Sequence, residues 1–234
     1  MSILVDQFID NMLQSLQCSA HVKDLKTGKY LCSNLINVRK FGFSKPEDIN
    51  GATIYDLNDF MLPFWGEKIL PNTIRQECEV RDTGKTTIDT GRAFLTKDGF
   101  ICVHHMTKTP IPNSNGIISS VFTMSANITD KLTLEQLWVM YKRFYLINKQ
   151  RAIQMYLTHI GVFHLFNECP TEAEIRVLIA RTQADSYKKI AELLNLSIKT
   201  VESHISNLNK KTKNFDLSSI VYLIKITDPH TLPL

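Results

Sequence analysis

Residues 186–212 read SYKKIAELLNLSIKTVESHISNLNKKT, and this stretch decides the fold of the C-terminal part of the chain. Apolar residues recur in it at three- and four-residue steps, first Ile190, Ala191 and Leu194, then Val201, Ile205 and Leu208. Such spacing predicts two amphipathic helices, each with one buried face. Asn195-Leu196-Ser197 between them is typical of a short turn. The pattern therefore predicts a helical hairpin.

The outward face of the second helix carries small polar and basic side chains, namely Lys199, Glu202, Ser203, Ser206, Asn209, Lys210 and Lys213. Short side chains let a helix approach base edges in the major groove, and flanking lysines meet phosphates. Ser197 at the N-cap and Thr200 in the first turn also present backbone N–H groups to a phosphate. A helical hairpin with an ordinary solvated face would show the same periodicity, so the spacing alone leaves both interpretations open.

Two further helices flank this hairpin. Thr171-Glu172-Ala173-Glu174 is a capping box that opens one helix, and residues 217–226 form the other. We therefore expect residues 167–234 to form an all-α domain of four helices. Residues 131–234 hold 14 Lys and Arg against 9 Asp and Glu, whereas residues 1–130 hold 13 against 14. The basic excess in the C-terminal part favours a polyanionic partner there.

The N-terminal half has a different texture. Residues 1–19 have apolar residues at helical spacing and predict an amphipathic helix. Between 20 and 130, short segments alternate with turn signals, which predicts strands over 20–25, 30–33, 86–96, 100–109 and 116–127 with short helices after the second strand. This order predicts an α+β domain that has an antiparallel sheet with helices on one side.

Residues 131–166 link the two halves. The segment has no proline, its only glycine is Gly161, and it carries a broad apolar stripe. We expect one long linking helix here, and 30 helical residues would reach roughly 45 Å. So long a helix is expected to pair with a second copy or to lie between domains, which makes it the predicted dimerisation element.

Residues 170–226 resemble the C-terminal helix-turn-helix domain of LuxR/NarL-type transcription regulators. The resemblance rests on Pro170–Leu178, Lys189–Ala191, Ser197–Val201, His204–Leu208 and Lys211. It implies base contacts by the outward residues after the Thr-Val pair, here Glu202, Ser203 and Ser206. It implies backbone contacts or bracing by Lys199, Thr200, His204, Asn207 and Lys211, and Lys210 on the outer face joins the expected DNA-binding set.

The chain departs from this family at three places. Lys189 replaces the usual acid before Ile-Ala, and Thr212-Lys213 replaces the usual Leu-Gly, although Asn214 is able to adopt the left-handed turn. Glu202 stands where a cation is often found. A carboxylate there points to a different operator, one in which it accepts from a cytosine amino group.

Residues 20–130 resemble a PAS sensory domain. The matching segments, in order, are Val22–Leu25, Gly28–Tyr30, Asn34, Phe41–Ser44, Pro46–Gly51, Thr83–Lys85, Lys97–Gly99, Thr109–Ile111, Asn115–Gly116 and Asn127–Asp130. Asn127 replaces the aspartate of the family's usual Asp-Ile-Thr, so the charged contact at this joint is lost. The resemblance implies that a small molecule or a partner is sensed against the sheet.

The polar candidates for that sensory site are His21, His104, His105, Cys32 and Cys102. His104 and His105 are adjacent on one strand, so only one of them faces inward. A satisfied strand histidine is the simpler interpretation than a heme ligand, and no cysteine has the sequence context of a flavin photosensor. We therefore assign no cofactor and no metal, and the ligand-binding residues stay unassigned.

Other classes of protein fit poorly. No apolar run reaches the ~18–20 residues of a membrane span, the acidic N-terminus does not resemble a signal peptide, and the five cysteines form no CxxC pair. No constellation of catalytic groups is visible, so we expect no enzyme. The expected protein is a cytoplasmic, homodimeric transcription regulator that binds double-stranded DNA under control of a sensed signal. The alternative is a PAS-like protein-interaction module that carries the DNA-binding domain and has no bound ligand.

Overall fold

The computed structural model describes residues 3–227, which divide into two compact units. The first unit comprises the chain up to Lys97 together with Cys102–Ile128, and the second comprises Asp98–Ile101 and the chain from Thr129 onward. The predicted C-terminal domain extended to residue 234, and its last seven residues lie outside the described part. Within the described residues, no helix is both long enough and apolar enough to cross a lipid bilayer.

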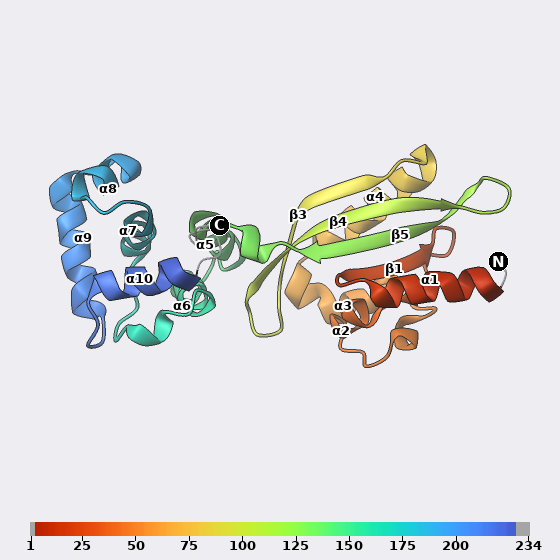
Figure 1. The fold of residues 1–234 in the computed structure, drawn as a ribbon, viewed down its shortest axis with the longest axis horizontal. Helices are drawn as coiled ribbons and strands as arrows, with labels where there is room; N and C mark the ends of the chain where they lie inside the picture. The colour runs from red at the N-terminus through yellow and green to blue at the C-terminus, as the bar shows by residue number, and fades with distance from the viewer. Residues whose placement is uncertain (1–2, 228–234) are drawn as a thin grey trace. The chain divides into compact units, whose positions relative to one another are not determined.

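The first unit is built on an antiparallel sheet of five strands in the order β2-β1-β5-β4-β3 (Figure 1). The strands are β1 (Ser19–Asp24), β2 (Tyr30–Ser33), β3 (Thr87–Leu95), β4 (Ile101–Pro112) and β5 (Ile118–Asn127). In the centre, His21 of β1 lies opposite Thr123 of β5, which in turn lies opposite Lys108 of β4. This strand order, with the helices inserted between β2 and β3, is the PAS arrangement, so the predicted α+β fold is confirmed.

Helices α2 (Leu35–Arg39), α3 (Ile54–Trp65) and α4 (Ile69–Thr83), with the 3-10 helix η1 (Pro46–Ile49), cover one face of the sheet, which we call the inner face. Tyr30 of β2 packs there against Val38 and Leu57. Helix α1 (Ile3–Ser15) packs on the outer face, where Leu13 contacts Ala20 and Val22. The outer face is therefore covered by the N-terminal helix at β1 and β2.

Local sequence explains where these helices begin and end. Thr53 caps α3 by accepting from the backbone N–H of Asp56, whose carboxylate accepts from the backbone N–H of Thr53 at 2.7 Å. Helix α3 was not among the predicted elements, and Pro63 lies inside its last turn. Gly84 ends α4 with a φ of 63°, a conformation that glycine adopts without strain.

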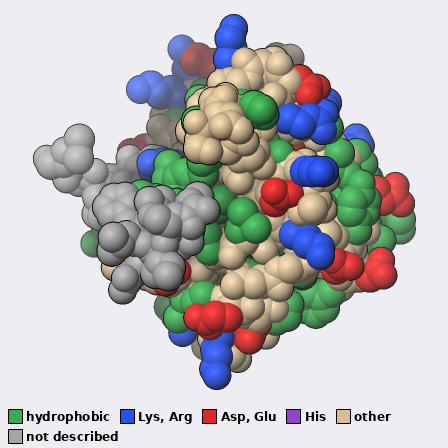
Figure 2. Space-filling view, turned by 90° about the vertical axis from the view of Figure 1, so that its right-hand side faces the viewer, with side chains coloured by type: hydrophobic (Ala, Val, Ile, Leu, Met, Phe, Trp, Pro, Cys, Tyr) green, Lys and Arg blue, Asp and Glu red, His purple; other side chains and the backbone are tan. Residues whose placement is uncertain are grey.

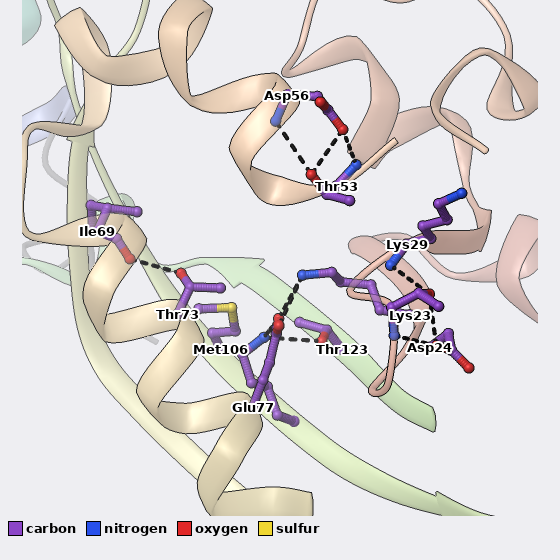
Figure 3. A network of polar contacts seen from close by, with 12 residues as sticks. Lys23, Asp24, Lys29, Thr53, Asp56, Ile69, Thr73, Glu77, Met106 and Thr123 are labelled. Atoms are coloured by element: carbon purple, nitrogen blue, oxygen red, sulfur yellow. Dashed lines mark hydrogen bonds and ion pairs between the residues drawn. The ribbon is translucent and has the colours of Figure 1, made fainter. Parts of the chain in front are cut away.

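The inner face is unusually polar at its centre. Glu77 on α4 accepts hydrogen bonds from the ammonium groups of Lys23 at 2.9 Å and of Lys108 at 2.8 Å, and both lysines are almost completely buried. Figure 3 shows Glu77 pointing from the helix toward Lys23 and Thr123 on the sheet. Burial alone would raise the pKa of Glu77, but the two lysines outweigh it and hold the pKa below its usual value.

The surface of the first unit carries charges of both signs. Figure 2 views the molecule from the end at which the N-terminus lies in Figure 1, and it shows Lys and Arg side chains interspersed with Asp and Glu. This mixture agrees with the nearly equal numbers of bases and acids in residues 1–130. The strongly basic part of the chain is therefore the C-terminal part.

The second unit begins with two helices where the sequence predicted one. α5 (Leu134–Phe144) and α6 (Lys149–His159) are separate, and the 3-10 helix η3 (Phe163–Leu165) follows them. Asn148 starts α6, because its side chain accepts from the backbone N–H of Arg151 at 2.9 Å. The predicted long linking helix over 131–166 is therefore wrong: a capping side chain competes with helix continuation at Asn148, and Tyr145 already leaves helical geometry with a ψ of 39°.

Aromatic residues join these two helices to residues 98–101. The Tyr141 hydroxyl accepts from the backbone N–H of Ile101 at 3.1 Å and lies 2.7 Å from Nδ1 of His159. The Tyr145 hydroxyl donates to the carbonyl of Gly99 at 2.8 Å, and Phe100 makes an edge contact with the His159 ring. The turn between β3 and β4 is thus part of the second unit.

The rest of the second unit is the predicted domain of four helices, α7 (Glu172–Gln183), α8 (Tyr187–Leu194), α9 (Ile198–Lys211) and α10 (Leu217–Thr227). Its interior is aliphatic, and the side chains buried there include Ile175, Leu178, Ile190, Val201, Leu208 and Ile220. α7 packs against each of the other three helices. The hairpin of α8 and α9 is therefore held on a rigid apolar support.

Candidate nucleic-acid interface

The turn between α8 and α9 follows from three polar residues. Asn195 closes α8 in the left-handed region with a φ of 54°, which asparagine tolerates better than most residues. Ser197 then caps α9 by accepting from the backbone N–H of Thr200 at 3.0 Å. These conformations fix the direction in which α9 leaves the turn and present its first turn to the solvent.

Helix α9 has one buried stripe and one open face. Val201, Ile205 and Leu208 are buried, as their spacing predicted. The opposite face is exposed, and the exposed members of the expected DNA-binding set are Lys199, Glu202, Ser203, Ser206, Asn207 and Lys210. The described residues of the second unit therefore leave this face uncovered.

Two members of the expected set lie on the flank of α9. Thr200 is half-buried, and its hydroxyl shares a 2.8 Å hydrogen bond with the hydroxyl of Ser197. His204 is also half-buried. Their positions are better suited to stabilising the helix and to contacting the sugar-phosphate backbone of DNA than to contacting bases.

Lys211 has an acidic partner inside the domain. Its ammonium donates to Glu174 at 2.7 Å, and the same carboxylate oxygen accepts from the backbone N–H of Thr171 at 2.7 Å. Burial alone would raise the pKa of Glu174, but the hydrogen bonds from Lys211 and Thr171 hold it below its usual value. The contact joins the end of α9 to the start of α7, so Lys211 occupies a bracing position.

An open hollow lies on the outer face of α9, lined by Tyr187, Glu202, Ile205, Ser206, Asn209 and Lys210. Tyr187 comes from the start of α8, is exposed, and lines this hollow together with residues of α9. Sequence reasoning about α9 alone missed Tyr187, because the residue belongs to the other helix. Its place directly after the N-cap Ser186 was the available signal.

The candidate sensory residues separate onto the two faces of the sheet. His104 is buried on the inner face, where Cys102 lies beside it, and His21 is buried on the same face. Cys32 packs with the outer-face cluster around Leu13, and alternation along β4 directs His105 to the outer face too. The structure therefore places three of the five candidates on the inner face, and among these it brings Cys102 and His104 into contact. The residues searched, 3–227, hold no group of three or more metal-ligating side chains.

Comparison with known families decides the class of the C-terminal domain. Residues 171–224 match the family model described as bacterial regulatory proteins of the luxR family. These residues form a luxR-family domain. The match covers α7 to α9 and α10 up to residue 224, and it includes every residue of the open α9 face described above, so the predicted LuxR-type domain is confirmed. The family consists of regulatory proteins, which agrees with the prediction that the chain is no enzyme. No curated protein matches the chain.

Solved structures extend the similarity beyond the luxR-family domain. The chain is similar to VqmA from Vibrio cholerae in a ligand–DNA complex, with 21% identity, a TM-score of 0.51, and coverage of 99% of this chain and 91% of that one. It also matches a phage VqmA–DPO complex, at 15% identity, a TM-score of 0.48 and coverage of 99% and 92%. The PAS domain of Bordetella pertussis BvgS matches at 18% identity, a TM-score of 0.45 and coverage of 59% and 96%. The Vibrio cholerae structure supports the fold of a PAS-like unit joined to a luxR-family domain.

Proposed function

We propose that this chain regulates transcription by binding a specific DNA sequence through its luxR-family domain, and that the PAS-like unit controls this binding when it senses a small molecule or a partner. The observation that carries the proposal is the open face of α9, which presents short polar side chains flanked by lysines inside a luxR-family domain. The ligand and DNA named for the Vibrio cholerae VqmA complex agree with such a role.

The proposed contacts divide by side-chain chemistry. Glu202, Ser203 and Ser206 lie along the centre of the open face and contact base edges, because their short side chains bring the helix close. Lys199 and Lys210 are exposed cations at its two ends and contact phosphates. Thr200, His204 and Asn207 contact the backbone or brace the helix, and the ion pair with Glu174 supports a bracing role for Lys211.

Selection of bound duplexes from a random pool tests this proposal with the full chain. We expect enrichment of a sequence with two half-sites, spaced about one helical turn apart if the protein binds as a symmetric dimer. Ser203→Ala and Glu202→Gln are expected to change the selected sequence more than the overall affinity. An unenriched pool at low ionic strength contradicts the proposed function.

Salt dependence tests the phosphate contacts separately. Lys199→Ala and Lys210→Ala are each expected to weaken binding to all sequences and to reduce the slope of log affinity against log salt by about 1. Lys131→Ala is the matched control, because Lys131 is an exposed cation outside α9. An equal slope for the wild type and both α9 variants contradicts the phosphate assignment.

We propose that α5 and the turn that follows it mediate dimerisation. Leu137, Trp138 and Tyr141 of α5 are buried within the second unit and are not available to a second copy. Val139, Leu146 and Ile147 are exposed instead, and Ile147 is fully so. These three residues lie within nine positions of one another in the sequence, and a run of exposed apolar side chains is a candidate interface.

Sedimentation tests the dimer assignment. Ile147→Asp and Leu146→Asp are expected to dissociate the dimer, while the exposed control Ile88→Asp in the first unit leaves it intact. If both turn variants sediment like the wild type, the dimer contact lies elsewhere.

A further inference from the structure

Four basic side chains reach the inner face of the PAS-like sheet, and one carboxylate there forms ion pairs with two of them. Lys23 and Lys108 both bond to Glu77. Lys40 and Arg92 also reach the inner face, and no ion pair joins either of them to an acid within the described residues. Both side chains are partly buried. Charges that lose part of their contact with water are normally paired, because desolvation is costly. An unpaired set of cations therefore needs an explanation.

Both cations lie around His104. The Lys40 ammonium is 3.3 Å from Nδ1 of His104 and 6.0 Å from the centre of the Phe94 ring, which itself contacts the His104 ring at 4.9 Å. The Ser125 hydroxyl also reaches Nδ1, at 2.7 Å. Since an ammonium can only donate, Nδ1 accepts and the imidazole proton is on Nε2. His104 is thus neutral and adds no negative charge.

The pKa values of His104 and Lys40 agree with an excess of positive charge around these side chains. Burial, followed by the nearby charges of Lys40 and Arg92, lowers the pKa of His104 to about 3. Burial lowers the pKa of Lys40 to about 8, and Arg92 contributes in the same direction. Asp89 and Glu77 attract the Arg92 guanidinium at longer range, but within the described residues no acid forms an ion pair with Lys40 or Arg92.

Arg92 is the second cation of this cluster. Its guanidinium donates to the sulfur of Met106 at 3.6 Å, a weak acceptor. Asp89, on the same strand, accepts at 3.3 Å from both Asn72 and Gln76 through one oxygen. The guanidinium fork suits bidentate binding of a carboxylate, and these contacts leave most of its donors available.

Two further polar atoms on the inner side have no partner in the described structure. They are Nδ1 of His21 and Oε1 of Gln76, and their side chains are 9% and 5% exposed. The His21 ring feels the charges of Lys108, Lys23 and Lys40, which places it among the same cations. Buried polar groups without partners are rare and mark places where a ligand supplies the missing bond.

We propose that the inner face binds a small organic carboxylate, whose charged group lies between Lys40 and Arg92 and whose apolar part contacts Phe94 and Met106. The proposal rests on the sensory role proposed above for this unit and names the chemical class of the sensed ligand. The apolar neighbours favour an organic acid over inorganic phosphate. His21 and Gln76 supply further hydrogen bonds to its polar groups.

The first experiment needs no knowledge of the ligand. Lys40→Met and Arg92→Met are each expected to raise the thermal midpoint of the purified, dialysed full chain by at least about 2 °C, because each removes a cation that forms no ion pair with an acid within the described residues. Lys23→Met is the matched control and is expected to lower the midpoint, because Lys23 bonds to Glu77. If both Lys40→Met and Arg92→Met lower the midpoint as Lys23→Met does, the two cations are structural and the proposal is overturned.

The second experiment measures binding with named probes. Sodium acetate, propionate and benzoate are compared with sodium chloride at equal ionic strength, and benzoate is also compared with benzamide, which has the same ring without the charge. We expect a saturable rise of the midpoint with carboxylate, largest for benzoate, absent for benzamide, and lost in Lys40→Met and Arg92→Met. No rise with any carboxylate, or a rise only with sodium phosphate, overturns the proposal.

These outcomes are separate from those of the DNA experiments. A chain that selects an operator but ignores every carboxylate keeps the proposed function and loses this ligand class. A chain that binds benzoate through Lys40 and Arg92 but selects no DNA keeps the ligand class and loses the proposed function.

Discussion

The two units of this protein have interiors of different chemistry. The interior of the luxR-family domain is aliphatic, with side chains such as Ile175, Val201 and Leu208, and its buried acid Glu174 has one lysine partner at its edge. The inner face of the PAS-like sheet instead buries Lys23, Lys108 and His104. An aliphatic interior is the simplest way to stabilise a scaffold. Polar groups retained in an interior at a cost in stability indicate a role other than holding the fold together.

The largest effect that tests this contrast is expected at Glu77. Glu77→Gln leaves Lys23 and Lys108 buried beside a neutral amide, so we expect the free energy of unfolding to fall by about 3–5 kcal/mol. Urea denaturation of the full chain measures this loss. Glu79→Gln on the same helix is the control, because within the described residues Glu79 pairs with Arg75 alone, in an exposed ion pair, and we expect about 0–1 kcal/mol there. Equal effects of the two variants would mean that the buried ion pairs do not stabilise the PAS-like unit.

An intermediate effect is expected from the pH dependence of the same interior. The pKa of His104 is about 3 in the folded unit and about 6.5 in the unfolded chain, so the unfolded chain binds more protons between these values. The stability associated with a neutral His104 is therefore fully present above pH 6.5. It is lost as the pH falls toward 3, and the free energy of unfolding then falls with a limiting slope of about 1.4 kcal/mol per pH unit.

His104→Phe is expected to remove this part of the acid sensitivity, as followed by denaturation at a series of pH values. Burial and the charges of Lys108 and Lys23 also lower the pKa of His21, so the double variant with His21→Phe is expected to reduce the slope further. An acid slope that persists unchanged in the double variant would assign the sensitivity to other groups.

The smallest effect is expected in the aliphatic interior. Ile205→Val removes one buried methylene from the stripe of α9 and is expected to cost about 0.5–1.5 kcal/mol. Ser203→Ala on the open face of the same helix serves as the control, with an expected change within about 0.5 kcal/mol. Denaturation of both variants separates packing from exposure, and a larger loss for Ser203→Ala would contradict the assignment of the two faces.

Local periodicity was enough to predict the helices of the C-terminal domain, and the resemblance of residues 170–226 supplied the family. Val201, Ile205 and Leu208 lie on one side of an ideal helix, and Ser197 is a strong N-cap, so tertiary contacts only reinforce what the sequence already favours. The same applies to β2, whose predicted range 30–33 is the observed one. Helix α3 was missed because Pro63 weakens its signal.

The linking segment was predicted incorrectly for a related reason. Its apolar stripe continues past Tyr145 and so predicts one continuous helix. The stripe gives no information about Asn148, which caps a new helix, or about the hydrogen bond from Tyr145 to Gly99. Contacts between residues distant in sequence decide the break, and periodicity within one segment contains no information about them.

The polar inner face of the PAS-like sheet was the hardest part to predict. An alternating strand pattern assigns lysine to the solvent side, yet Lys23 and Lys108 lie inside because Glu77 from α4 meets both. The sequences of β1 and β4 contain no signal that predicts their contact with an acid on α4, a helix between β2 and β3. The orientation of the two histidines on β4 was easier to predict, since side chains alternate between the faces of a strand and one of two adjacent residues must face inward.

The end of α9 is tied down by more than the ion pair of Lys211. The backbone N–H of Asn167 donates to the carbonyl of Lys211 at 2.8 Å, and that of Lys213 donates to the carbonyl of Leu165 at 2.8 Å, which makes a short antiparallel bridge between Phe166 and Thr212. A helix anchored in this way keeps its orientation while the protein diffuses. Docking on a duplex then requires little loss of conformational entropy from α9, and association is expected to be fast and governed by encounter rather than by rearrangement.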